Sequence, residues 1–202
     1  MTLTDDVVIK HLGRVAYEPT WRAMRDFTLG RSEATPDELW LLEHTPVYTL
    51  GQGARPAAVP NGIPLVQVDR GGEITYHGPG QLVLYALVDL ARRDIKVKRF
   101  VWLLEQAVIE LVGPNAERRP GAPGVYVEGA KVAALGIRVT RGRAYHGVAL
   151  NVDMDLTPFS AIDPCGYPGL AVTQTRTLGI LGSPAELGER LAQLLIAGLD
   201  RA

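Results

Sequence analysis

Residues 125–152 read VYVEGAKVAALGIRVTRGRAYHGVALNV, and their pattern decides the fold class. Two short turn signals, Gly129-Ala130 and Arg141-Gly142-Arg143, separate three runs rich in apolar residues. A short turn that contains glycine between apolar runs is typical of a β-hairpin. The stretch therefore predicts an antiparallel meander of three strands, over residues 125–128, 131–140 and 145–152.

Helices and further strands surround this meander in the sequence. Residues 81–90 (QLVLYALVDL) are almost continuously apolar, as in a strand that is covered on both faces. Residues 98–112 carry a helical stripe of apolar side chains, and Gly113-Pro114 ends it. Ser183-Pro184-Ala185-Glu186 is a capping box with proline at the first helical position, so it begins a last helix. Shorter signals predict strands at residues 7–9, 38–43, 46–50 and 65–68 and a helix whose N-cap is Thr20.

The order of these segments favours one domain. Strands and helices mix without a steady βαβ alternation, which predicts an α/β (α+β) fold of mixed β-sheets flanked by helices. No linker or change of composition divides the 202 residues, so we expect a single domain over residues 1–202.

Composition excludes several function classes. The net charge is -1 and no basic tract suggests nucleic acid as a partner. No apolar run approaches the roughly 20 residues that cross a bilayer, and the acidic N-terminus does not resemble a signal peptide. A single cysteine cannot form an intramolecular disulfide. We expect a cytoplasmic protein without membrane contacts, and a monomer because no long amphipathic surface stands out.

A glycine-rich stretch, residues 70–81 (RGGEITYHGPGQ), could bind a ligand. Glycine lets the backbone approach a ligand closely, and backbone N–H groups can form an anion-binding concavity. The same composition also fits an ordinary hairpin loop. There is no phosphate-loop motif in the chain.

Lys131 and His146 are two candidates for acid–base chemistry within the meander. By the two-residue period Lys131 shares one face with Ala133, Leu135 and Ile137, where it could simply extend along the strand end. A lysine at the rim of an apolar surface can also have a shifted pKa. His146 could be a base or a structural residue, and a regular strand places it on the face opposite Asn151.

Cys165 is the only cysteine, and it lies in the stretch AIDPCGYPGL, residues 161–170. Proline and glycine keep this stretch out of regular structure, and loops often carry reactive groups. A chance cysteine on a surface turn is the alternative. The four histidines show no H-x-x-x-H spacing, and one cysteine cannot build a cysteine-rich zinc site, so we expect no metal.

Four segments together resemble a known family. They are EHTPVYTLG (43–51), RGGEITYHGPGQ (70–81), GAKVAALGIR (129–138) and HGVALNV (146–152), the last followed by Pro164-Cys165-Gly166. In this order they are similar to the lipoyl(octanoyl) transferase family of lipoate biosynthesis, the octanoyl-acyl carrier protein:protein N-octanoyltransferases. Thr45 and Val132 depart mildly from the family pattern, which commonly has proline and isoleucine there.

The resemblance implies a biotin/lipoate protein ligase-like catalytic domain and a cysteine–lysine dyad. Cys165 would be the nucleophile that carries the acyl group as a thioester, and Lys131 would tune it. The donor would be octanoyl-acyl carrier protein, and the acceptors would be lipoyl domains of 2-oxoacid dehydrogenase E2 subunits and the glycine-cleavage H protein, with no cofactor. The residues implied to line the octanoyl pocket are Arg70, Gly71, Gly72, Glu73, Ile74, Thr75, Tyr76, His77, Ala134, Leu135, Gly136, Gly147, Val148 and Ala149.

Three other functions also fit the sequence. An ATP-dependent lipoate or biotin protein ligase on the same fold would activate a free acid and need no cysteine. A non-catalytic acyl or lipoyl-domain binding protein would form no acyl adduct on Cys165. A Cys–His hydrolase using His77 or His146 would release free octanoate. The sequence leaves open the acyl chain length, the acceptor domain and the groups that stabilise the oxyanion.

Overall fold

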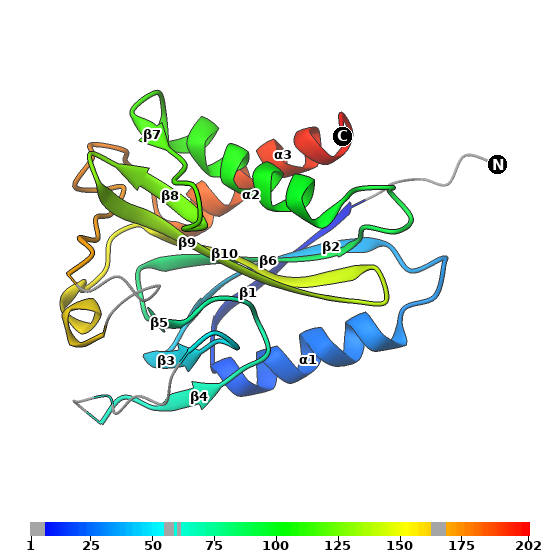
Figure 1. Ribbon diagram of the computed structural model, residues 1–202, viewed down its shortest axis with the longest axis horizontal. Helices are drawn as coiled ribbons and strands as arrows, with labels where there is room; N and C mark the ends of the chain where they lie inside the picture. The colour runs from blue at the N-terminus through cyan, green and yellow to red at the C-terminus, as the bar shows by residue number, and fades with distance from the viewer. Residues whose placement is uncertain (1–6, 55–58, 60–61, 163–168) are drawn as a thin grey trace.

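The computed structural model describes residues 7–54, 59, 62–162 and 169–202. Its centre is a seven-stranded sheet in the order β1-β2-β6-β10-β9-β8-β7 (Figure 1). Strands β1 and β2 are parallel, and all other neighbours in this sheet are antiparallel. The strands are β1 (Val7–Val15), β2 (Asp37–His44), β6 (Gln81–Asp89), β7 (Ala116–Glu117), β8 (Gly124–Val127), β9 (Ala130–Thr140) and β10 (Arg143–Asn151).

The predicted meander is confirmed as β8, β9 and β10. Its first turn is Glu128-Gly129, with φ of 49° and 87°, and its second is Arg141-Gly142, with φ of 50° and 77°. Two consecutive residues with positive φ make the turn whose twist matches that of the flanking strands. The first turn therefore lies one residue earlier than the sequence predicts, and Ala130 already belongs to β9.

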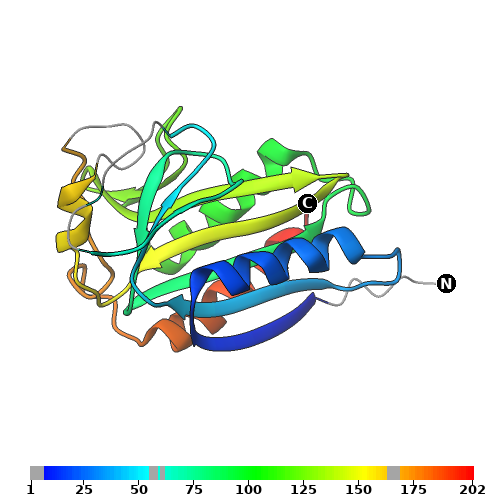
Figure 2. The ribbon, with the colours of Figure 1, turned by 90° about the horizontal axis from the view of Figure 1, so that it is seen from below.

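Helices cover both faces of the large sheet (Figures 1 and 2). Helices α2 (Val97–Val112) and α3 (Pro184–Leu199) lie on one face, and α1 (Tyr17–Gly30) lies on the other. A three-stranded sheet lies beside α1, in the order β4 (Leu65–Gln67), β3 (Val47–Leu50) and β5 (Ile74–His77). We call the face under α2 and α3 the helix-pair face, and the face under α1 and the small sheet the α1 face.

Strand β6 shows how the sequence pattern produces this arrangement. All nine of its residues are buried. Leu82, Leu84, Ala86 and Val88 belong to the core on the helix-pair face, and Val83, Tyr85 and Leu87 belong to a smaller cluster on the α1 face. The prediction of a strand covered on both faces is confirmed, and the mixed α/β class with it.

The helix ends are partly as predicted. Ser183 and Glu186 form the expected capping box, and α2 ends at Gly113, whose φ is 111°. Thr20 does not cap α1, which begins at Tyr17, and its hydroxyl donates to the Ala16 carbonyl at 2.8 Å. Pro19 fits inside the first turn because the amide groups there have no helical partner.

Two strands differ from their predicted extent. Strand β1 continues to Val15, well beyond the predicted residues 7–9. Strand β5 lies inside the stretch 70–81, which the sequence presents as a loop. Its pairing with β3 is possible because only the two ends of that stretch are rich in glycine. Within the described ranges, no helix is long and apolar enough to span a membrane.

Candidate active site

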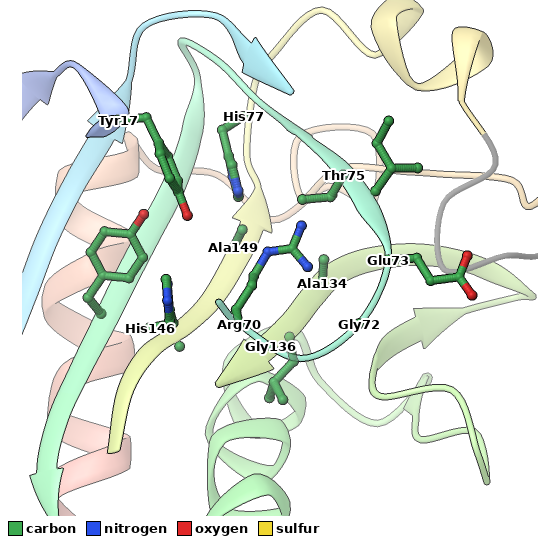
Figure 3. Close-up of a pocket in the computed structure, with 14 residues that line it drawn as sticks. Tyr17, Arg70, Gly72, Glu73, Thr75, His77, Ala134, Gly136, His146 and Ala149 are labelled. Carbon is green, nitrogen blue, oxygen red and sulfur yellow. The ribbon is translucent and has the colours of Figure 1, made fainter. Parts of the chain in front are cut away.

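A cavity opens on the α1 face of the large sheet, between β5, β9 and β10 (Figure 3). Its volume is about 490 Å³ including the open mouth. Eleven of the fourteen residues that the sequence suggests for the acyl pocket line it. They are Arg70, Gly72, Glu73, Ile74, Thr75, His77, Ala134, Leu135, Gly136, Gly147 and Ala149.

The cavity runs from an exposed mouth to a buried end. Gly72 is exposed and Glu73 half-buried, whereas Tyr17, Tyr85 and His146 are 4%, 4% and 1% exposed. In Figure 3, Glu73 lies on one side and Tyr17 and His146 lie on the other, with Arg70 between them. Tyr17, Tyr85 and His146 line the cavity but are absent from the sequence-based set. For Tyr85 the one available signal in the sequence is the two-residue alternation along β6, which puts Tyr85 on the same face as Val83 and Leu87.

Three residues of that set lie elsewhere. Val148 belongs to the core on the helix-pair face. The Tyr76 ring packs in a separate cluster, 5.4 Å from Tyr48 and 5.6 Å from Phe159 between ring centroids. The Gly71 amide donates to the Ile137 carbonyl at 3.0 Å, so this N–H is already used in holding the loop against the edge of β9.

Gly136 allows the loop to pack closely against β9. A Cβ at this position would lie 2.9 Å from the Gly71 carbonyl oxygen and 3.2 Å from the Arg70 Cδ. Arg70 in turn donates from its guanidinium to the Thr49 carbonyl and hydroxyl, both at 2.8 Å. The contacts tie the glycine-rich loop to β3 and β9, which form one wall of the cavity.

A β-bulge at Val132 sets the direction of Lys131. Ala133 pairs with Val125, but Lys131 pairs with Tyr126, so β9 carries one extra residue between them. Val132 and Ala133 both belong to the core on the helix-pair face. The prediction that Lys131 shares the face of Ala133 is therefore wrong, because bulges turn neighbouring side chains relative to the regular alternation.

Lys131 instead lies with Tyr126 on the opposite face. Its Nζ is 5.1 Å from the centroid of the Tyr126 ring and donates to the Pro123 carbonyl at 3.3 Å. Lys131 is only 3% exposed. Pro123 also lines a second hollow, which shares Gly72, Glu73, Leu135 and Gly136 with the cavity. The amine thus lies next to a hollow that adjoins the cavity mouth.

The predicted nucleophile, Cys165, lies outside the described residues. The chain is described again from Gly169, and this segment pairs with β9 at Lys131. The Lys131 amide donates to the Ala171 carbonyl at 2.8 Å, and the Thr173 amide donates to the Lys131 carbonyl at 2.9 Å. Ala171 follows Cys165 by six positions in the sequence.

His146 departs from the geometry of a regular strand. Its φ is 63°, a left-handed value that is uncommon in residues other than glycine. A regular β10 would point His146 to the helix-pair face with Ala144 and Val148. Instead its ring stacks on Tyr145, with centroids 4.9 Å apart, and it lines the cavity. The expectation from a regular strand is therefore wrong for His146, and the left-handed backbone is the reason.

Asp69 holds this unusual histidine in place. Its carboxylate accepts from His146 Nε2 at 2.9 Å, from Trp21 Nε1 at 2.9 Å and from the Tyr145 hydroxyl at 2.5 Å. Burial raises the pKa of Asp69, but these hydrogen bonds outweigh it and hold the pKa well below the usual range. Burial lowers the pKa of His146 despite its hydrogen bond to Asp69. The pair is therefore a carboxylate and a neutral imidazole.

The other two histidines near the cavity are also neutral. Burial lowers the pKa of His44 to about 4 and that of His77 to about 3. Burial raises the pKa of Tyr17 to about 12, so its hydroxyl keeps its proton. The rings at the buried end of the cavity are therefore neutral at neutral pH, and the charges in the lining come from Arg70, between that end and the mouth, and from Glu73 at the mouth.

Comparisons with known proteins identify the family of the chain. Residues 17–190 match the family described as the lipoyl protein ligase A/B catalytic domain. Among curated relatives, an octanoyltransferase of Dechloromonas aromatica is 57% identical over 96% of this chain and 97% of its own length. An octanoyltransferase of Thiobacillus denitrificans is 60% identical over 94% of this chain and 89% of its own length.

Solved structures show the same fold at low sequence identity. A bipartite lipoate protein ligase from Thermoplasma acidophilum has a TM-score of 0.72 at 17% identity, covering 96% of this chain and 85% of that one. A lipoate-protein ligase A bound with ATP has a TM-score of 0.71 at 16% identity, covering 97% and 85%. The predicted ligase-like fold is confirmed by these structures.

Proposed function

The chain belongs to the family of lipoyl protein ligase A/B catalytic domains, and from this membership we infer that it is an octanoyltransferase acting in protein lipoylation. The observation that carries the inference is the identity of more than half of the aligned residues with curated octanoyltransferases along nearly the whole chain. The cavity supports it, because its wall of small residues between an exposed mouth and an uncharged end suits a short saturated acyl chain.

We propose a two-step mechanism in which Cys165 and Lys131 form the dyad. The Cys165 thiolate attacks the carbonyl of octanoyl-acyl carrier protein, and the phosphopantetheine thiol leaves with a proton from Lys131. A lysine amine of a lipoyl domain then attacks the Cys165 thioester. Neutral Lys131 takes the proton of that amine, and Cys165 leaves as the thiolate. Exchange of a thioester for an amide is downhill, so the reaction needs no ATP.

The surroundings of Lys131 support its role. A free cysteine has a pKa of about 8.5, and a neighbouring ammonium favours the thiolate. Lys131 Nζ lies between the Pro123 carbonyl and the Tyr126 ring, beside the hollow at the cavity mouth. Its backbone is hydrogen-bonded to Ala171 and Thr173, which follow Cys165 in the sequence. The proposal requires that Lys131 act on a group held at the side of the cavity where Pro123 lines the second hollow.

The wider assignment follows from the same family. The acceptors in this proposal are lipoyl domains of E2 subunits and the glycine-cleavage H protein, and residues 1–202 act as one catalytic domain. We further propose that the enzyme works as a monomer in the cytoplasm.

One experiment tests this function against its alternatives. The protein is incubated with octanoyl-acyl carrier protein, with and without a lipoyl domain, and both proteins are followed by intact-mass spectrometry. We expect an octanoyl adduct on Cys165 and its transfer to the lipoyl domain, and Cys165→Ser should abolish both. Ligation of free octanoate by Cys165→Ser in the presence of ATP would instead indicate a ligase. Release of octanoate without transfer would indicate a hydrolase, and the absence of any adduct would indicate a binding protein.

Lys131→Met provides a second arm of the same experiment. Methionine keeps most of the length of the side chain but carries no ammonium, so acylation of Cys165 should slow strongly while the fold is kept. Lys10→Met is the matched control, because Lys10 is on β1 and its partner is Glu38. Unchanged acylation by Lys131→Met would contradict the dyad.

A further inference from the structure

The buried end of the cavity is a wall of four aromatic and histidine rings packed against one another. The Tyr17 ring stacks on His77 with centroids 5.8 Å apart, and the Tyr85 ring meets the His146 ring edge to face at 6.1 Å. None of the four is more than 6% exposed. In Figure 3, Tyr17, His77 and His146 lie at the end of the cavity away from Glu73.

Hydrogen bonds through His44 fix the Tyr85 hydroxyl. His44 Nδ1 lies 3.0 Å from the Val15 carbonyl, which can only accept, so Nδ1 carries the proton. His44 Nε2 must then accept from the Tyr85 hydroxyl, at 2.7 Å. Tyr17, whose ring stacks on His77, lines the same end of the cavity. The Tyr85 donor is thus engaged with His44 and not with the cavity.

The two histidines of the wall present acceptors. His146 Nε2 donates to the Asp69 carboxylate, so its Nδ1 carries a lone pair, and Nδ1 is buried with no hydrogen-bond partner among the described residues. His77 Nδ1 faces the Gln81 Oε1 at 2.7 Å, while the Gln81 amide nitrogen donates elsewhere. His77 Nε2 is therefore a second lone pair.

We propose that this polar end wall, formed by Tyr17, His77, Tyr85 and His146, determines the longest acyl chain that the enzyme accepts. The assignment rests on the octanoyl transfer proposed above and adds a specificity determinant to it. An acyl chain that ends before the wall lies between the small side chains of β9 and β10 and the residues of β5. A chain two carbons longer must displace rings that are already packed against one another.

Tyr17→Phe is the variant that tests the wall most cleanly. It removes the Tyr17 hydroxyl from the end of the cavity, and Tyr85 still donates to His44 at 2.7 Å. The wall gains space and becomes more apolar. Each additional methylene that is then buried should improve kcat/KM about four-fold.

The measurement is a chain-length series. Hexanoyl, octanoyl, decanoyl and dodecanoyl thioesters of acyl carrier protein are compared as donors, and the ratio of kcat/KM for decanoyl to octanoyl is determined. We expect this ratio to rise at least four-fold in Tyr17→Phe. Tyr48→Phe is the matched control, since it removes an equally buried hydroxyl, which donates to the Pro158 carbonyl at 2.8 Å, away from the cavity. Its ratio should equal that of the wild type.

His146→Asn is a second variant, in case Tyr17→Phe does not fold. Asparagine tolerates the left-handed backbone at this position. Its side chain is smaller than that of histidine, so the cavity becomes longer at its buried end. We again expect a higher ratio of decanoyl to octanoyl. An unchanged ratio in both folded variants would overturn the assignment of the wall.

A binding readout separates this inference from the proposed function. The dissociation constants of free octanoate and decanoate are measured by calorimetry on the wild type and on Tyr17→Phe. A shift toward decanoate without any transfer would contradict only the proposed function. Transfer by the wild type with no shift in either assay would contradict only the end wall.

Discussion

The two faces of the large sheet are built on different principles. On the helix-pair face, β2, β6 and β10 contribute regularly alternating apolar side chains that pack under α2 and α3. On the α1 face the apolar cluster is smaller, and beside it lie the cavity, Asp69 and three histidines. The strands that carry this face are interrupted at Val132 and His146. The helix-pair face therefore supplies most of the stability, and the α1 face holds polar groups where a ligand can reach them.

Leu84→Ala should produce the largest loss of stability. Leu84 lies on the helix-pair face and is 0% exposed. Removing most of a buried leucine side chain lowers the free energy of unfolding by about 2–5 kcal/mol, depending on how far the site collapses. Urea unfolding measures this loss, and the decanoyl-to-octanoyl ratio should not change. A loss below about 1 kcal/mol would contradict the assignment of stability to this face.

Acid should lower the free energy of unfolding because two buried histidines lie on the α1 face. His44 and His77 have pKa values of about 4 and about 3 in the folded state, below the ordinary value of 6.5. Above pH 6.5 the folded and unfolded states are both neutral at these rings. As the pH falls below 6.5 the unfolded chain binds protons that the folded chain does not, so stability is lost progressively down to the folded pKa values.

This effect is large enough to measure. Between pH 6.5 and 5 each of the two histidines should lower the free energy of unfolding by about 2 kcal/mol. Urea unfolding at pH 7.5 and 5.0 gives the difference, and NMR of the folded protein should show no titration of either ring in that interval. Equal stability at the two pH values would mean that these rings are not held neutral.

Asp69→Asn should have a moderate effect on stability and a local effect on the cavity. The substitution keeps the shape but removes the charge that accepts from Trp21, Tyr145 and His146, and hydrogen bonds to a charged group contribute about 2 kcal/mol. NMR of the His146 ring should report its reorientation. The control is Asp153→Asn, because the Asp153 carboxylate forms an exposed ion pair with Arg176, which contributes less than about 0.5 kcal/mol. Equal losses in the two variants would contradict a special role for Asp69.

Tyr145→Phe should have the smallest effect. It removes one of the hydrogen bonds to Asp69 and leaves those from Trp21 and His146, so we expect a loss of about 1 kcal/mol. Thermal unfolding of Tyr145→Phe, Asp69→Asn and the wild type gives the loss of stability in each variant. A loss as large as that of Asp69→Asn would mean that Tyr145 alone holds the carboxylate.

The regular strands and helices were predictable because their apolar residues recur at the spacing that each element requires. The meander, the buried strand β6 and the capping box of α3 follow from turn residues and apolar spacing alone. Most of the cavity residues were also named from the sequence, through the resemblance of the stretch 70–81 and of β9 and β10 to a family.

The remaining parts depend on departures from those periods. No pattern in the sequence predicts the extra residue of β9 at Val132 or the left-handed backbone of His146. Both features turn a polar side chain onto the α1 face, and both depend on tertiary partners, namely Tyr126 and Asp69. Tyr17 was missed for a similar reason, since it joins the cavity only through the packing of α1 on the sheet.

The bulge at Val132 also constrains how this strand can change in length. Deleting that one residue would restore an uninterrupted ladder between β8 and β9, and it would swing the Lys131 amine toward the hydrocarbon core. An insertion or deletion that removes the bulge would improve the backbone pairing of β8 with β9. It would also turn Lys131 away from the α1 face, where the proposed reaction needs its amine. The length of β9 is set by the direction in which one amine must point, and an alignment of related chains should show no gaps there.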